Sequence, residues 1–155
     1  MKIRKATKKD EKEFLKVQKK AFPNLNSKKQ ALYFEEKIKK KEIFVAEQKG
    51  EYAGHNCFGK YLLAPPFSRG VFLEELAVKK KFRGEGIGTN LINALIKFCK
   101  KNKINMFYLS TGDFKANKAI KYYKKLGFKI VGKMKDINPK SEYSYGEIFM
   151  AKVIK

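Results

Sequence analysis

A glycine-rich loop between a short apolar strand and an amphipathic helix is the most informative chemical feature of this chain. Arg83, Gly84, Gly86 and Gly88 follow the strand expected over Val71–Val78, with the spacing Arg-x-x-Gly-x-Gly. Glycine allows close backbone approach to a ligand and positive φ, and N–H groups at a helix N-terminus attract anions. The pattern predicts a phosphate-binding loop, with an ordinary strand-to-helix turn as the alternative. No Gly-Lys-Ser/Thr follows, which excludes a Walker loop, and the Rossmann arrangement of glycines and a later acid is also missing.

Two adjacent carboxylates interrupt the strand before this loop. Glu74 and Glu75 stand side by side in an otherwise apolar segment of a chain with only 15 acidic residues. A carboxylate there is unfavourable unless it serves a purpose or faces solvent, and both interpretations are kept open. The apolar positions before and after the pair also differ in parity, which predicts a β-bulge. Because neighbouring side chains on a strand point to opposite faces, only one of the two should face a reactive slot.

The loop and a second segment together resemble a known family. Arg83–Gly88 is similar to the acetyl-CoA pyrophosphate loop of the GNAT superfamily of N-acetyltransferases. Lys118–Phe128 resembles the family segment Asn-x-x-Ala-x-x-φ-Tyr-x-x-x-Gly-Phe, with Tyr123 at the tyrosine; the family asparagine falls at Ala116, one position before Asn117. The resemblance implies an α/β fold with a mixed sheet of about six to seven strands flanked by about four helices. We expect one acetyltransferase domain over residues 1–155.

The resemblance also implies roles for individual residues. Glu74, nine positions before Arg83, is the implied base, directly or through water, and Tyr123 is the implied acid for the leaving thiolate. A tyrosine at this helical spacing is alternatively a core residue. Backbone groups of the strand would pair with pantetheine and supply an oxyanion donor at Leu76, while the loop amides hold the pyrophosphate. The residues expected to bind the cofactor are Leu76, Ala77, Val78, Arg83, Gly84, Glu85, Gly86, Ile87, Gly88, Thr89 and Asn117.

The implied reaction is transfer of an acetyl group from acetyl-CoA to a primary amine by direct attack in a ternary complex. No cysteine lies in the motifs to suggest an acyl-enzyme, and no metal is expected. The acceptor is either a small-molecule amine or a peptide or protein amine, because residues 22–40 and 133–145, which set it in this family, carry no recognisable motif. Two alternatives are a non-catalytic acyl-CoA-binding or protein-interaction module and a basic nucleic-acid-associated protein. A homodimer is left open.

The charge of the chain is strongly positive, at +22, yet only three of its 37 basic residues are arginines. Specific nucleic-acid sites draw on arginine for bidentate contacts, and here the lysines are scattered along every helix, so no specific nucleic-acid partner is expected. The field attracts polyanions such as CoA and repels cationic polyamines or aminoglycosides.

The remaining composition favours a cytoplasmic protein that does not cross a membrane. No apolar run approaches the ~20 residues that a membrane-spanning helix needs, and the N-terminus does not resemble a signal peptide. Cys57 and Cys99 fit no CxxC or zinc pattern and are expected to be reduced and buried. His55, the only histidine, has either a structural or a substrate-side role.

Hydrophobic periodicity predicts the element order β-α-α-β-β-β-α-β-α-β-β. The first strands should pair antiparallel, and residues 71–110 should form a parallel crossover. Capping patterns start the first two helices at Thr7–Asp10 and Ser27–Gln30. Polar loops are expected at Ala64–Gly70 and Lys133–Ser144. Strands are expected at Lys2–Ala6, Glu42–Gln48, Tyr52–Leu63 (broken at Gly54 and Gly59), Val71–Val78, Ile104–Ser110, Phe128–Gly132 and Gly146–Val153.

Overall fold

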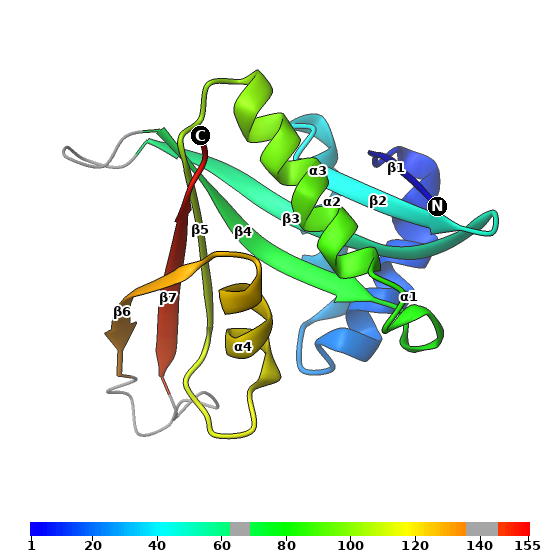
Figure 1. The fold of residues 1–155 in the computed structure, drawn as a ribbon. Coiled ribbons are helices and arrows are strands. Elements are labelled where there is room, and N and C mark those ends of the chain that lie inside the picture. Colours follow the sequence, from blue (N-terminus) through cyan, green and yellow to red (C-terminus); the bar gives the residue numbers. More distant parts are fainter. Residues whose placement is uncertain (63–68, 136–145) are drawn as a thin grey trace. The chain divides into compact units, whose positions relative to one another are not determined.

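Seven strands form one mixed sheet in the order β1-β2-β3-β4-β5-β7-β6 (Figure 1). The computed structural model describes residues 1–62, 69–135 and 146–155. The strands are β1 (Lys2–Lys5), β2 (Ile43–Gln48), β3 (Glu51–Leu62), β4 (Arg69–Val78), β5 (Met106–Gly112), β6 (Lys129–Met134) and β7 (Glu147–Val153). The helices are α1 (Glu11–Ala21), α2 (Ser27–Lys39), α3 (Ile87–Lys101) and α4 (Lys118–Lys125), with single 3-10 turns η1 (Lys8–Asp10) and η2 (Lys80–Phe82). The sheet and the four helices confirm the expected fold.

The chain divides into two compact units. The first comprises Met1–Gly59 and Glu74–Phe98, and the second comprises Lys60–Leu73 and Cys99–Lys155. Strand β4 therefore contributes to both units, with its boundary between Leu73 and Glu74. Among the described residues, no helix is both long enough and apolar enough to cross a bilayer.

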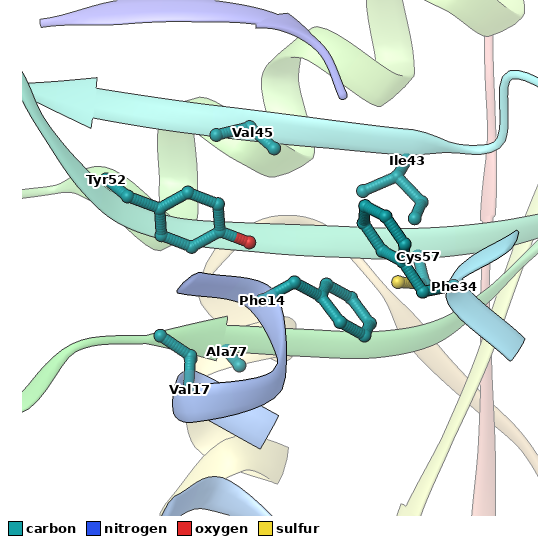
Figure 2. Close-up of a cluster of buried hydrophobic side chains, with 8 residues drawn as sticks. All are labelled: Phe14, Val17, Phe34, Ile43, Val45, Tyr52, Cys57 and Ala77. Atoms are coloured by element: carbon teal, nitrogen blue, oxygen red, sulfur yellow. The ribbon is translucent and has the colours of Figure 1, made fainter. Parts of the chain in front are cut away.

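In the first unit, alternate residues of β2, β3 and β4 enter two separate hydrophobic clusters. Figure 2 shows the cluster under α1 and α2, where Phe14 and Phe34 pack at 4.8 Å between ring centroids. The second cluster contains Ile87 and Leu91 of α3, together with Ala46 and Ala53, each of which is next along its strand to a member of the first cluster. This alternation is what a sheet covered on both faces requires. Members of the first cluster are Phe14, Val17, Phe34, Ile43, Val45, Tyr52, Cys57 and Ala77.

Strands β1, β2 and β3 pair antiparallel, as expected. The β2–β3 hairpin turns through Lys49 and Gly50, both at positive φ, which matches the predicted turn. Strand β3 is continuous through Gly54 and Gly59, so it is not broken at either glycine, but its register with β2 shifts between Tyr52 and Gly54, next to the first predicted interruption. At Gly54 an added Cβ would lie 2.4 Å from the Ala77 carbonyl oxygen. This glycine serves close backbone approach between β3 and β4.

In the second unit, β4 pairs parallel with β5 from Gly70 to Leu73, which confirms the parallel pairing expected there. β5 and β6 each pair antiparallel with β7. Strand β6 ends the strand order and is exposed along its whole length. Helix α4 ends where Gly127 takes a φ of +83°, the C-terminal position predicted for this glycine.

Several element boundaries differ from the sequence-based expectations; β4, for example, begins at Arg69, within the loop expected at Ala64–Gly70. Helix α2 is capped by Asn26, whose side chain accepts from the amides of Lys28 and Lys29, so the capping box expected at Ser27 is wrong. β5 starts at Met106 rather than Ile104, and β6 continues to Met134 where a loop was expected. Most of the two predicted polar loops, at residues 63–68 and 136–145, lies outside the described residues.

A buried ion-pair cluster joins α2 to β3, to β4 and to Glu42, the residue before β2. The Lys37 ammonium, on a residue only 5% exposed, donates to Glu74 Oε1 at 2.6 Å, to the Phe58 carbonyl at 2.9 Å and to Glu42 Oε2 at 3.1 Å. Burial acts to lower the pKa of Lys37, but the two carboxylates outweigh burial and raise it. Lys37 therefore stays charged and ties α2 to β4 at Glu74.

Replacing this ammonium should destabilise the protein because it leaves two carboxylates in a buried site without their cation. We expect Lys37→Met to lower the free energy of unfolding by about 3 kcal/mol, at the lower end of the cost of removing one partner of a buried pair. Urea unfolding followed by circular dichroism measures it. Lys40→Met, on the same helix and in an exposed pair with Glu36, is the control and should be near neutral. Equal effects of the two substitutions would contradict a special role for Lys37.

Candidate active site

The glycine loop has the backbone conformation that its sequence predicts. Gly84 and Gly86 take φ values of +88° and +75°, in the region that side chains with a Cβ rarely adopt. Helix α3 begins at Ile87, directly after the loop. The first turn of an α-helix directs N–H groups out of its N-terminus without intrahelical partners. The loop therefore presents backbone donors and the positive end of a helix dipole at one place.

The side chains of the loop bond to other partners, so its backbone amides remain the donors at this place. The Glu85 carboxylate accepts from Gln48 Nε2 at 3.1 Å. Asn90 Nδ2 donates to the Gly86 carbonyl at 2.9 Å and so fastens the loop to the first turn of α3. Arg83 is exposed, and its Nε donates to the Val78 carbonyl at 3.2 Å, which holds the side chain where the loop begins. An anion at this loop would meet amides and a guanidinium.

The carboxylates of Glu74 and Glu75 both reach the α1 and α2 side of the first unit. Glu74 Oε2 accepts from the Tyr33 hydroxyl at 2.6 Å, and its other oxygen accepts from Lys37. Glu75 accepts from Gln18 Nε2 of α1. The expectation that the two point to opposite faces is therefore wrong. The two side chains do not alternate in direction as neighbours on a regular strand would, and the β-bulge expected there stays a prediction.

Glu74 is partly accessible to solvent. Its side chain is 18% exposed, and it lies between a phenol and an ammonium. Burial raises the pKa of Tyr33, so the phenol stays protonated and donates to Glu74. Both neighbours are donors to the anionic carboxylate. Glu74 can therefore hold an ammonium group or take a proton through water.

Glu75 is half-buried beside α1. Burial raises its pKa, although the hydrogen bond from Gln18 acts in the opposite direction. Gln18, itself 1% exposed, is held by a second hydrogen bond of its Nε2 to Gln30 Oε1 at 2.9 Å. Glu75 thus belongs to the interior of the site, with α1 and α2 above it.

The backbone expected to pair with pantetheine, Leu76–Val78, forms the C-terminal end of β4. The side chains of Leu76 and Val78 pack on the α3 side and that of Ala77 on the other. The β4–β5 register covers Gly70–Leu73 and so stops short of this segment.

In the second unit, Tyr123 is 8% exposed on α4 and packs edge-on against Phe128 at 5.8 Å between centroids. Burial raises the pKa of its hydroxyl, which keeps the phenol protonated. Asn117 caps α4: its Oδ1 accepts from the Ala119 amide, and its Nδ2 donates to Thr111 Oγ1 and to the Gly112 carbonyl. Asn117 therefore has a local structural role, with both amide hydrogens in use.

Sequence reasoning missed the polar residues that surround the carboxylates. Tyr33 and Lys37 lie on α2, and Gln18 lies on α1. One signal for Lys37 was available: it follows Phe34 by three positions and so stands on the apolar stripe of its helix. Because lysines occur along every helix of this chain, the sequence did not distinguish Lys37 from a lysine exposed to solvent.

Known proteins match this chain over most of its length. Residues 11–128 match the acetyltransferase (GNAT) family. An uncharacterized N-acetyltransferase of Methanocaldococcus jannaschii is 35% identical over 135 residues, which cover 81% of this chain and 59% of that protein. Streptothricin acetyltransferase A of Bacillus subtilis is 28% identical over 96 residues, which cover 59% of this chain and 54% of that protein. The chain thus spans somewhat more than half the length of these two curated relatives.

A solved structure agrees with these matches. The N-acetyltransferase from Staphylococcus aureus Mu50 has a TM-score of 0.82 with this chain at 25% identity, covering 99% of this chain and 98% of the other. With the glycine loop, the β4 carboxylates and the family match over residues 11–128, the chain belongs to the GNAT family of acetyltransferases.

Proposed function

We propose that this protein is an acetyl-CoA-dependent N-acetyltransferase that moves an acetyl group to a primary amine by direct attack in a ternary complex. The observation that carries the proposal is the loop at Gly84 and Gly86, whose positive φ values expose backbone amides at the start of α3. Membership of the GNAT family supports acetyl-CoA as the donor. In this proposal the pyrophosphate lies against the amides of residues 84–89, with Arg83 as a further cation.

The thioester binds along the end of β4 in this proposal. Backbone groups of Leu76–Val78 pair with the pantetheine as a neighbouring strand would, and the Leu76 amide donates to the oxyanion of the tetrahedral intermediate. Glu74 receives the proton of the attacking amine, directly or through water, a role that its partly exposed carboxylate supports. Tyr123 gives a proton to the leaving thiolate, a role that a phenol held in its protonated form supports.

The acceptor in this proposal is a small-molecule amine or a peptide or protein amine. Similarity to a streptothricin acetyltransferase favours including small-molecule antibiotics among the candidates. The charge of +22 acts against highly cationic acceptors, so their rates should rise most with salt. We also propose a cytoplasmic location, in keeping with the free, buried thiols of Cys57 and Cys99. Release of CoA thiol across a panel of amines and peptides tests the activity and narrows the acceptor; no release with any of them contradicts the proposal.

Blocking the glycine loop should abolish cofactor binding. Gly86→Val adds a branched side chain at a φ of +75°, beside backbone that must approach a phosphate. We expect the thermal stabilisation by millimolar acetyl-CoA to disappear in this variant. Gly50→Val is the matched control, because Gly50 has a φ of +76° and equally open surroundings but lies in the β2–β3 hairpin. This control should be strained to a similar degree yet keep the stabilisation, and loss in both variants would point to misfolding instead.

Removing the proposed base should slow turnover without weakening acetyl-CoA binding. Glu74→Gln keeps the size of the side chain but ends proton acceptance, so we expect kcat to fall roughly 10²–10⁴-fold. Steady-state kinetics measure it, with acetyl-CoA affinity followed by calorimetry. Glu42→Gln is the control, because it removes a carboxylate from the same Lys37 ammonium. A similar loss of kcat in both variants would assign the effect to the ion-pair cluster.

Tyr123→Phe tests the proposed acid. This change removes only the hydroxyl, which makes no hydrogen bond within the described part of the chain, so stability should change little. We expect kcat to fall roughly 10–10⁴-fold, and the loss should shrink with a thioester whose thiol is a better leaving group. Tyr122→Phe, on the neighbouring position, should retain the wild-type rate. An unchanged kcat in Tyr123→Phe would make this tyrosine a core residue.

A further inference from the structure

A second cluster of reactive side chains lies in the first unit, beneath α1. A ring nitrogen of His55, the Cys57 sulfur and a Glu75 oxygen all lie within 4.8 Å of one another. His55 and Cys57 are alternate residues of β3 and so share a face, and Glu75 comes from β4. His55 and Cys57 are both 0% exposed. Three different ligand types therefore converge, with two of the residues fully buried and Glu75 of intermediate exposure.

Two buried polar atoms at this cluster have no hydrogen-bond partner. They are His55 Nε2 and Gln18 Oε1, and the amide of the same glutamine donates to Glu75. The other ring nitrogen of His55, Nδ1, is paired with the Tyr52 hydroxyl at 2.8 Å. Leaving polar atoms unpaired in a protein interior costs free energy. A bound ion or molecule that pairs with them is therefore the simplest explanation. A histidine held through one nitrogen with the other open is also the usual arrangement of a metal ligand.

The charges around the cluster favour a cation. Glu42, Glu74 and Glu75 are close enough to share Lys37 as a neighbouring cation, and Lys37 already donates to the first two. A divalent ion bound to one thiolate, one carboxylate and a neutral imidazole forms a group with no net charge. Such a group avoids most of the cost of burying ions.

We propose that His55, Cys57 and Glu75 bind one Zn²⁺ ion in a structural site that ties β3 to β4. Nitrogen, thiolate and carboxylate oxygen are the ligands that zinc takes in proteins, and in a tetrahedral site they stand roughly 3.5 Å apart, so the donors need to close by about 1 Å. Gln18 Oε1 or a water completes the coordination. Binding displaces the proton of the Cys57 thiol to solvent, and no oxidation or reduction takes place.

Zinc would also fix the segment that carries Glu74, because Glu75 is the next residue. The site is structural in this proposal: it takes no part in acetyl transfer, and its test does not depend on the acceptor or on activity. Its spacing explains why the sequence indicated no metal. His-x-Cys on one strand with a glutamate on another lacks the paired short spacings of zinc ribbons and fingers.

The test begins with the intact protein purified from zinc-supplemented medium and dialysed against a metal-free buffer. Elemental analysis should find about one zinc per chain, and Co²⁺ added to stripped protein should give a thiolate-to-cobalt absorption band. Cys57→Ala should abolish that band, whereas Cys99→Ala, which removes the other buried free thiol, should keep it. Tyr52→Phe removes the partner of His55 Nδ1 and should weaken zinc affinity about 10–100-fold.

A wild-type measurement covers the case in which Cys57→Ala does not fold. Stripped protein should gain thermal stability with Zn²⁺ but not with Mg²⁺, which prefers oxygen ligands, and the gain should persist in Cys99→Ala. Absence of zinc, of a cobalt–thiolate band and of a zinc-specific shift in the wild type would overturn the proposal and assign the two unpaired atoms to buried water. Equal loss of the band in the Cys57 and Cys99 variants would also overturn it.

Discussion

The buried ammonium of Lys37 is the interaction on which the geometry of the first unit depends. One side chain bonds to a carboxylate before β2, a carbonyl of β3 and a carboxylate of β4, and so connects α2 to three consecutive chain segments. A lysine suits this position, because its three hydrogens point in three directions from one compact charge. Lys37 orients Glu74 through one carboxylate oxygen, and Tyr33 holds the other.

The arrangement reverses the charge balance of the molecule as a whole. The surface of a chain with 37 basic residues is overwhelmingly positive, while the interior beneath α1 and α2 gathers three glutamates around one lysine. The exterior field and the interior carboxylates act at different ranges, because salt screens exposed charges over about 10 Å but hardly screens buried ones. A negatively charged molecule is attracted by the positive surface. A positively charged group is stabilised only where it reaches the buried glutamates.

The parts of the structure that could be predicted are those whose signals are local. The glycines at 84 and 86 are predictable because positive φ is a property of single residues, and the order of strands and helices follows from periodicity. The change in parity of the apolar positions around Glu74 and Glu75 was visible in the sequence. The direction in which the two carboxylates point was not. Which face both carboxylates take depends on Gln18, Tyr33 and Lys37, which come from distant segments. The N-cap of α2 was also not predictable from the sequence. Asn26 and Ser27 could each cap the helix, and the backbone conformation determines that Asn26 does so.

Strand β6 has a consequence for how copies of this protein behave toward one another. It is the outermost strand of the sheet order, and Ile130, Val131 and Met134 are exposed along it. An open apolar edge is a template for pairing with another chain, and charged residues are the usual protection. Here Lys129 and Lys133 stand on the same strand as those apolar residues, and the net charge repels any second copy that approaches. The lysines therefore oppose association between copies of the protein. This repulsion is strongest in dilute salt and weakens as ionic strength rises.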